Sequence, residues 1–200
     1  MLVKICGIKT ITAAHAAIEA GADWLGFVFA PSKRQISPEQ AAAIVKTVPS
    51  SVRTVGVFVN EDVVQMNNVA AQVGLHMIQL HGDESPSVAH RLPYQVIKAF
   101  SIDRIDLATI TSFPCDYYLI DSPRTTFYGG SGQPFDWEAV HELPINQNKV
   151  ILAGGLTPEN VQHAIHRVNP VGVDVSSGVE TNGVKDGVKI EQFINQAKVN

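Results

Sequence analysis

Two turns near the C-terminus have residue types suited to binding a phosphate. The segments VILAGGLTPEN (150–160) and VGVDVSSGVET (171–181) each run from a β-branched apolar stretch directly into glycines and hydroxyls. Backbone N–H groups of such turns, one of which opens onto a capped helix, can surround the oxygens of a doubly charged phosphate. A phosphate site built by the turns after the last two strands is a recurrent feature of the (β/α)8 barrel. The two turns therefore predict both a ligand class and a fold.

A cysteine and an aspartate stand where they could transfer protons. Cys6 ends the apolar run LVKIC (2–6), and Asp121 directly follows YYLI (117–120). A thiolate base and a carboxyl acid on opposite sides of one cavity form an acid–base pair. Taken singly, a buried cysteine is usually an inert small hydrophobic residue, and an aspartate after a strand is often a helix cap. The shared position at strand ends favours catalysis for both.

Further polar residues are expected on the same face of the sheet as Cys6. Because side chains alternate along a strand, Lys4 and Cys6 share one face. The same rule places on this inner face the residues Gln79, His81, Lys98, Asp121, Asp174 and Ser176. Charges are rarely buried unless they are paired or functional. We expect functional roles among these residues, and the structural alternative is that Lys4, Lys98 and Asp174 only form internal ion pairs.

Two polar residues have more than one interpretation. His81, in QLHGDES, is a proton shuttle, a phosphate partner or a strand-end histidine bonded to the backbone, and we favour a supporting role. Arg34, in APSKRQIS, either binds a carboxylate through two hydrogen bonds or is an ordinary solvated charge. The residues alone leave both interpretations of Arg34 open.

Eight short apolar runs are expected to be the strands that position these side chains. Their β-branched and aromatic content favours buried strands over helices. The runs are LVKIC (2–6), WLGFVF (24–29), TVGVFV (54–59), MIQL (77–80), VIKAF (96–100), YYLI (117–120), VILA (150–153) and VGVDV (171–175). Helical patterns lie between them, which predicts parallel strands joined by right-handed crossovers. A doubly wound open sheet alternates in the same way, but the count of eight favours a compact (β/α)8 TIM barrel of the ribulose-phosphate-binding type.

Start and stop signals mark several of the helices. The sequence SPEQ (37–40) predicts a capping box with proline at the first helical position. Thr157-Pro158 predicts another helix start, and Asp186 can open the last helix. Gly21 is expected to follow the end of the first helix.

Composition and charge limit the classes of function. The 200 residues are 45% hydrophobic, and no composition shift divides them, so we expect a single barrel domain over 1–200. A barrel usually needs at least about 200 residues, so its loops and helices must be short. The net charge of −4 argues against a nucleic-acid partner. Two cysteines are too few for a disulfide framework, which favours a cytoplasmic location, and no apolar run is long enough for a membrane span.

Longer motifs resemble the phosphoribosylanthranilate isomerase family of tryptophan biosynthesis. In the family's order, over nearly the whole chain, these are VKICGIKT (3–10), GFVFAPSKRQISPEQA (26–41), VGVFVN (55–60), IQLHGDE (78–84), YGGSGQPFDW (128–137), LAGGLTPENV (152–161) and VDVSSGVE (173–180). The resemblance implies an Amadori rearrangement of N-(5-phosphoribosyl)anthranilate to 1-(2-carboxyphenylamino)-1-deoxyribulose 5-phosphate. The implied partner is therefore a phosphorylated small molecule.

The resemblance also implies roles for individual residues. The cysteine of KICG, here Cys6, is the general base, and the aspartate that ends the sixth strand, here Asp121, is the general acid. Arg34 contacts the anthranilate carboxylate. The phosphate site includes Gly154, Gly155, Ser176 and Ser177. We add His81 and Asp174 to the expected substrate-binding set because they share the inner face.

The residue types fit the chemistry of this reaction. A protonated Asp121 would open the ribose ring to a Schiff base, whose positive charge acidifies the C2 proton that Cys6 removes. The cationic imine is itself the electron sink, so neither a metal ion nor a cofactor is expected. A cysteine needs a lowered pKa to act as a base at neutral pH, and we expect an inward Lys4 to lower it.

Several other functions compete with this one. They are another enzyme of the phosphate-binding barrels (an epimerase or an indole-ring-forming synthase), an aldolase with Lys4 or Lys98 as Schiff-base nucleophile, and a phosphate-metabolite binder without catalysis.

The glycine-rich stretch within 122–135 is either a lid that closes over the substrate or a static turn. The chain is expected to be a monomer or a homodimer.

Overall fold

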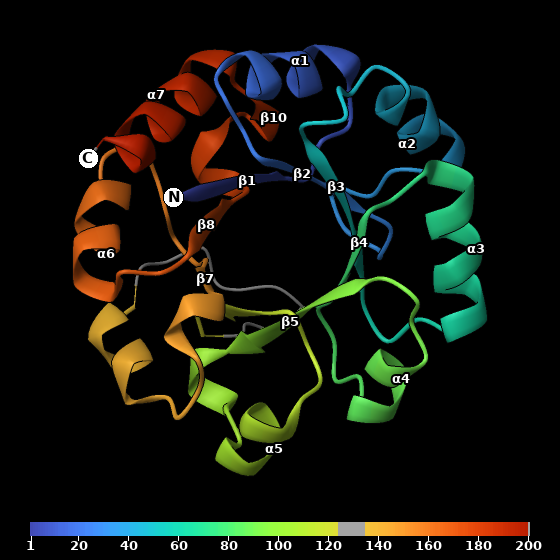
Figure 1. Cartoon of the computed structure of the whole chain (residues 1–200). Coiled ribbons are helices and arrows are strands. Elements are labelled where there is room, and N and C mark those ends of the chain that lie inside the picture. The colour runs from blue at the N-terminus through green and yellow to red at the C-terminus, as the bar shows by residue number, and fades with distance from the viewer. Residues whose placement is uncertain (124–134, 200) are drawn as a thin grey trace.

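Eight parallel strands form a closed barrel in the computed structural model, which describes residues 1–123 and 135–199 (Figure 1). In chain order, which is also their order around the barrel, the strands are β1 (Leu2–Cys6), β2 (Trp24–Val28), β3 (Arg53–Phe58), β4 (Met77–Leu80), β5 (Gln95–Ser101), β6 (Tyr117–Asp121), β7 (Val150–Leu152) and β8 (Gly172–Val175). Each predicted apolar run forms one of these strands. The predicted (β/α)8 barrel is therefore confirmed.

The barrel closes because β1 pairs with both β2 and β8. Lys4 lies in register with Trp24 on one side and with Asp174 on the other. A doubly wound sheet would leave its edge strands unpaired, so this pairing excludes the open-sheet alternative. It also brings the two ends of the chain together on one side of the molecule.

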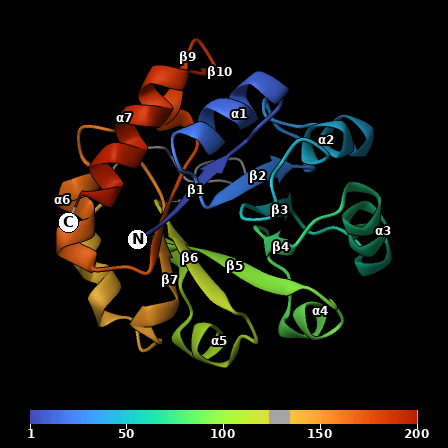
Figure 2. The same ribbon diagram turned by 45° about the horizontal axis from the view of Figure 1, so that its top comes forward.

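Short helices surround the strands in a ring (Figures 1 and 2). They are α1 (Ile11–Glu19), α2 (Pro38–Val45), α3 (Val63–Val73), α4 (Pro86–His90), α5 (Leu107–Ser112), α6 (Val161–Val168) and α7 (Gly187–Lys198). Short 3₁₀ helices are η1 (Ile102–Arg104), η2 (Trp137–Glu142), η3 (Gln147–Lys149) and η4 (Ser177–Val179). Because the helices are short, a chain of about 200 residues is long enough to complete a barrel. No helix in the described part of the chain combines the length and apolar character needed to cross a membrane.

The capping residues position most of the helices as predicted. Ser37 and Gln40 form the reciprocal hydrogen bonds of a capping box at the start of α2. Asp186 accepts from the first backbone N–H groups of α7, and Gly21 follows α1 with φ of +96°. The helix expected from Thr157 begins later, at Val161, because Thr157 to Asn160 form a turn instead.

Apolar side chains pack in two layers. An inner cluster fills the barrel and consists of Trp24, Val55, Met77, Ile97, Ala99, Leu119, Ile151 and Ala153. A larger outer cluster lies between the strands and the helices and includes Val3, Ile5, Leu80, Val96 and Val173. The inner cluster occupies the middle of the barrel, which leaves the carboxyl ends of the strands free to carry polar residues.

Lys98 lies on the outer face of the sheet, and the prediction that it points inward was wrong. Ile97 and Ala99 take the inner face of β5, so the alternation turns Lys98 toward the helices. There its ammonium group contacts Glu84 Oε2 at 2.9 Å and the rings of Phe100 and Phe113 at 5.6 Å. This ion pair stabilises a charge that would otherwise be costly to bury.

The predicted loop over 122–135 falls almost entirely outside the described residues. Ser122, Pro123 and Phe135 are described, and residues 124–134 are not. The choice between a closing lid and a static turn therefore stays a prediction.

Candidate functional site

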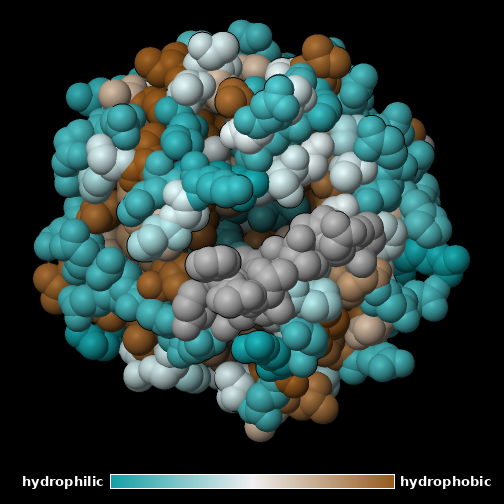
Figure 3. Space-filling view, turned by 180° about the vertical axis from the view of Figure 1, so that it is seen from behind, coloured by the Kyte–Doolittle hydropathy of each residue, from teal (hydrophilic) through white to brown (hydrophobic). Residues whose placement is uncertain are grey.

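A cavity of about 590 Å³ opens at the carboxyl ends of the strands. Figure 3 shows this face of the molecule, hollowed near its centre and bordered by hydrophilic residues. All nine residues predicted for the site line the cavity: Cys6, Arg34, His81, Asp121, Gly154, Gly155, Asp174, Ser176 and Ser177. The volume lies within the range of small-molecule sites, about 300–1,000 Å³. The sequence-based expectation that these residues meet at one mouth is thus met by the geometry.

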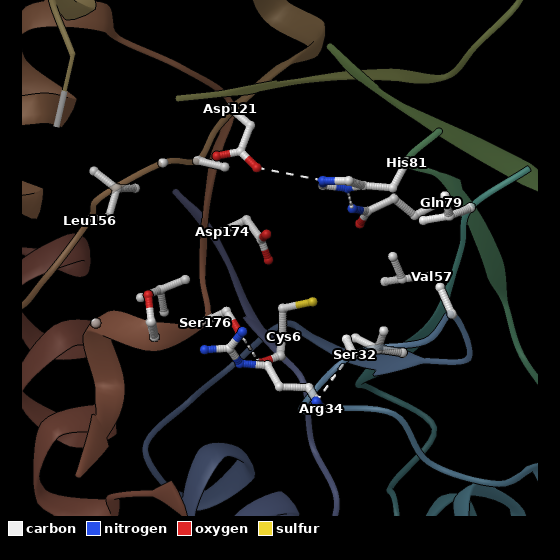
Figure 4. A pocket seen from close by; sticks show the side chains of 18 of the residues that line it. Cys6, Ser32, Arg34, Val57, Gln79, His81, Asp121, Leu156, Asp174 and Ser176 are labelled. Atoms are coloured by element: carbon white, nitrogen blue, oxygen red, sulfur yellow. Dashed lines mark hydrogen bonds and ion pairs between the residues drawn. The ribbon is translucent and has the colours of Figure 1, made fainter. Parts of the chain in front are cut away.

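Cys6 ends β1, and its thiol points into the cavity (Figure 4). The residue is only 7% exposed, and this burial raises the pKa of the Cys6 thiol above its ordinary value. Lys4 hydrogen-bonds the thiol and acts in the opposite direction, as predicted, but does not outweigh the loss of hydration. The expected net lowering of the Cys6 pKa was therefore wrong.

Lys4 is held by Asp174 across the seam between β1 and β8. Its Nζ lies 2.8 Å from Asp174 Oδ1, and Lys4 is 1% exposed. Burial alone would lower the pKa of Lys4, but the charges of Asp174 and Cys6 raise it, so Lys4 carries its proton at neutral pH. Part of its positive charge is thus compensated by Asp174, which limits its effect on the thiol. Lys4 and Lys98 both form the internal ion pairs considered as an alternative.

Asp121 faces His81 across the cavity (Figure 4). His81 Nε2 lies 3.6 Å from Asp121 Oδ2, and its other ring nitrogen, Nδ1, lies 2.8 Å from Gln79 Nε2. Because the Gln79 amide donates to Nδ1, a neutral His81 carries its proton on Nε2, the nitrogen that faces Asp121. Gln79 therefore fixes which ring nitrogen of His81 faces Asp121. This agrees with a supporting role for His81.

The two glycine- and hydroxyl-rich turns lie side by side at the same mouth. Gly154 has φ of +82°, and a Cβ on it would stand 2.3 Å from Ser122 N, so only glycine lets this turn approach β6 so closely. In the neighbouring turn, Ser176 Oγ donates to the carbonyl oxygen of Cys6 at 3.1 Å. The turns thus place backbone groups and hydroxyls next to Asp121 and Cys6.

Arg34 is neither a solvated charge nor an unengaged group. Its Nε and Nη2 donate to Glu180 Oε1 and Oε2 at 2.7 and 2.8 Å. Lys185 Nζ lies 2.6 Å from Glu180 Oε1 as well. Glu180 and Lys185 were not predicted from the sequence. The available signal was the motif VDVSSGVE, which ends at Glu180.

Two lysines considered as Schiff-base nucleophiles are poorly placed for that role. Lys98 lies on the outer face of β5 and does not line the cavity. Lys4 is protonated and paired with Asp174, and an ammonium group is not a nucleophile. The arrangement instead brings together a thiol, a carboxyl group and two glycine- and hydroxyl-rich turns, which suits proton transfer on a phosphorylated substrate.

Comparison with known proteins gives the same family over almost the whole chain. The family model for N-(5'phosphoribosyl)anthranilate (PRA) isomerase matches residues 3–196. The N-(5'-phosphoribosyl)anthranilate isomerase of Listeria welshimeri is 49% identical over 99% of this chain and 98% of its own length. The protein of the same name from Oceanobacillus iheyensis is 48% identical over 99% and 97%.

Solved structures agree with the sequence comparison. A phosphoribosyl anthranilate isomerase in complex with reduced 1-(o-carboxyphenylamino)-1-deoxyribulose 5-phosphate is 38% identical, with a TM-score of 0.84 over 99% of this chain and 98% of that one. Mutually generated monomers of the dimeric enzyme from Thermotoga maritima are also 38% identical, with a TM-score of 0.86 over the same shares.

Proposed function

The chain belongs to the N-(5'-phosphoribosyl)anthranilate isomerase family, and we propose that Cys6 is the general base and Asp121 the general acid of its reaction. The enzyme is an isomerase of tryptophan biosynthesis that converts N-(5-phosphoribosyl)anthranilate into 1-(2-carboxyphenylamino)-1-deoxyribulose 5-phosphate. One observation supports the assignment above all: the two residues, far apart in the sequence, line one cavity together with both anion-binding turns.

The reaction begins at the ribose ring. Asp121, in its protonated form, gives its proton to the ring oxygen, and the C1–O bond breaks as the anthranilate nitrogen forms a double bond to C1. The product is an open-chain Schiff base with a positive charge on nitrogen. His81 is a positioning residue here, because its Nε2 faces Asp121 and Gln79 fixes its ring.

Cys6 acts in the second step. Its thiolate takes the proton from C2, and the electrons of the C2–H bond move toward the cationic nitrogen to give an enolamine. Tautomerisation then places a proton on C1 and leaves a ketone at C2, so no net oxidation occurs. The positively charged nitrogen of the Schiff base is two bonds from C2, and a nearby positive charge favours the thiolate. This attraction acts against burial, which raises the pKa of Cys6.

The two ends of the substrate carry negative charge, and the cavity has a partner for each. We assign the phosphate to the turns that contain Gly154, Gly155, Ser176 and Ser177. Arg34 binds the anthranilate carboxylate with N–H groups that Glu180 does not use. Asp174 lies in the cavity wall and keeps Lys4 in place beside Cys6. Holding both ends orients the sugar between the acid and the base.

Loss of either proposed proton-transfer group should slow turnover strongly. We expect Cys6→Ser and Asp121→Asn each to reduce kcat by about 10²–10⁴-fold, the usual contribution of general acid–base catalysis. The measurement is the decrease in substrate fluorescence during conversion. Cys115→Ser is the matched control, because Cys115 is the other cysteine and does not line the cavity. Turnover of Cys6→Ser close to that of the control would show that another group is the base.

We also propose a location and an oligomeric state for the enzyme. We expect it to act in the cytoplasm, as the cysteine content favours, and to be a monomer or a homodimer. A dimeric relative from Thermotoga maritima makes the second state a reasonable expectation, and sedimentation of the full chain decides between them.

A further inference from the structure

Glu180 and Lys185 form a buried charged pair beside the cavity, and the proton transfers described above do not use either residue. They lie opposite each other in a small hairpin of β9 (Glu180–Thr181) and β10 (Val184–Lys185). Their side chains are 9% and 4% exposed. Buried ion pairs cost more hydration than surface pairs, so their presence beside the site calls for a functional account.

Arg34 is held from two sides. Its head group donates through Nε and Nη2 to both oxygens of Glu180. Its stem lies against Gly7, whose φ is +80° and on which a Cβ would stand 2.6 Å from Arg34 Cδ. A side chain this long has many rotamers in solution, and these two contacts restrict them. The side chain nevertheless remains 32% exposed and lines the cavity.

A continuous set of polar contacts joins this arginine to the rest of the site. Lys185 Nζ contacts Glu180 Oε1 at 2.6 Å and donates to the Ser176 carbonyl oxygen at 2.9 Å. Ser176 Oγ in turn donates to the Cys6 carbonyl oxygen. The hairpin therefore links the residue proposed for the substrate carboxylate to the turn proposed for the phosphate and to the end of β1.

Resting on the proposed function, we propose that Glu180 is a positioning residue that directs the remaining N–H groups of Arg34 toward the substrate carboxylate, while Lys185 holds Glu180. A guanidinium group has five N–H donors, and Glu180 engages two of them. The remaining three, on Nη1 and Nη2, form a fork that fits a second carboxylate. Orientation before binding reduces the entropy that the substrate would otherwise lose in ordering the side chain.

The charges of this cluster are consistent with the assignment. Burial alone would raise the pKa of Glu180, but hydrogen bonds from Arg34 and Lys185 lower it, so Glu180 is a carboxylate at neutral pH. Two cations and one anion leave a single net positive charge at this end of the cavity. Lys185 thus keeps Glu180 from cancelling the attraction of Arg34 for an anion.

Removal of the Glu180 charge distinguishes two effects: the orientation of Arg34 by Glu180, and the electrostatic attraction of the cluster for anions. Glu180→Gln raises the net charge of the cluster, so attraction alone would make every anion bind more tightly. Loss of orientation has the opposite effect on an aromatic carboxylate. We test this in the full-length enzyme with anthranilate and inorganic phosphate, each measured as a competitive inhibitor of turnover.

We expect Glu180→Gln to weaken inhibition by anthranilate about tenfold, the scale of a lost charge-assisted contact, and inhibition by phosphate by less than about threefold. The KM should rise while kcat changes little, because the carboxylate is bound equally before and during the reaction. Glu138→Gln removes the same charge from an exposed pair with Arg167 and should alter neither inhibitor. Glu180→Asp keeps the charge with a shorter side chain, and we expect partial recovery of anthranilate binding.

Two results would overturn the proposal. Tighter binding of both inhibitors by Glu180→Gln would show that Glu180 only reduces the positive charge. Equal weakening of both, with no recovery in Glu180→Asp, would show a general loosening of the cavity. The proposed function is judged separately, since it stands or falls with turnover by the unsubstituted enzyme and its loss in Cys6→Ser.

Discussion

At the scale of single residues, we expect the environment of Cys6, the proposed general base, to set the pH range in which the free enzyme is active. A general base works in its deprotonated form, so kcat/KM rises with pH through the pKa of the free thiol. Burial raises the pKa of Cys6, Lys4 opposes this rise and Asp174 adds to it. The rising limb of kcat/KM should therefore lie above the ordinary range of a cysteine.

Substitutions of the two charged neighbours should move the Cys6 pKa in opposite directions. Lys4→Met removes the positive charge and should raise the pKa, slowing alkylation by iodoacetamide at pH 8 about tenfold, or one pKa unit. Asp174→Asn removes the negative charge and should lower the pKa, speeding alkylation. Shifts in the same direction, or none, would mean that these residues have no electrostatic role at the thiol.

The alkylation experiment is best made in a Cys115→Ser background. Burial raises the pKa of Cys115 to about 12, so this residue is almost entirely a thiol at pH 8. Its removal ensures that the measured rate belongs to Cys6 alone. Circular dichroism of both variants checks that the barrel survives the loss of one partner of a buried ion pair.

Part of the site could be predicted from the sequence. Cys6 and Asp121 could be inferred because each ends an apolar run, and parallel strands place their ends at one mouth. The motif VDVSSGVE contains Glu180, but its pairing with Arg34 and Lys185 could not be predicted. A hairpin of two-residue strands has no periodicity, and Glu180 lies 146 positions from Arg34 in the sequence.

At the scale of elements, β5 shows where the alternation rule reaches its limit. The rule sorts a strand into two faces but does not say which one is inside. Lys98 was assigned to the cavity because it is polar, yet Ile97 and Ala99 fill the barrel and Lys98 faces Glu84. The polar partner of Lys98 lies in another loop, so nothing within β5 itself indicates its side.

The buried pair of Lys98 and Glu84 should matter for stability and little for turnover. Lys98→Met leaves Glu84 buried without its cation, which should lower the free energy of unfolding by about 3–5 kcal/mol. Urea denaturation measures this. Arg167→Gln, which removes an exposed pair, is the control and should cost less than about 1 kcal/mol. An unchanged midpoint in Lys98→Met would mean that water or another donor replaces the ammonium group.

Turnover of Lys98→Met distinguishes two functions. The proposed isomerase needs no lysine nucleophile, so activity below the unfolding transition should stay within about threefold of the unsubstituted enzyme, whereas a Schiff-base enzyme would lose it. Borohydride trapping gives an independent reading. A lysine adduct formed with the substrate would contradict the proton-transfer mechanism.

At the scale of the whole molecule, we expect the barrel to unfold as one unit. The chain has two tryptophans, Trp24 in the inner cluster of β2 and Trp137 in η2 after β6. Each variant, Trp24→Phe and Trp137→Phe, therefore reports on one half of the chain. Coincident fluorescence transitions in urea, matching circular dichroism, would support a single domain over 1–200, and two separate midpoints would contradict it.

Closure of the barrel also determines when, during synthesis of the chain, the site can become complete. Lys4, beside the thiol, obtains its counter-charge from Asp174, which lies 170 positions later in the chain. A newly made polypeptide thus contains the proposed base early in synthesis, but the surroundings of Cys6 stay incomplete until β8 pairs with β1. We therefore expect prematurely terminated chains that lack β8 to be inactive.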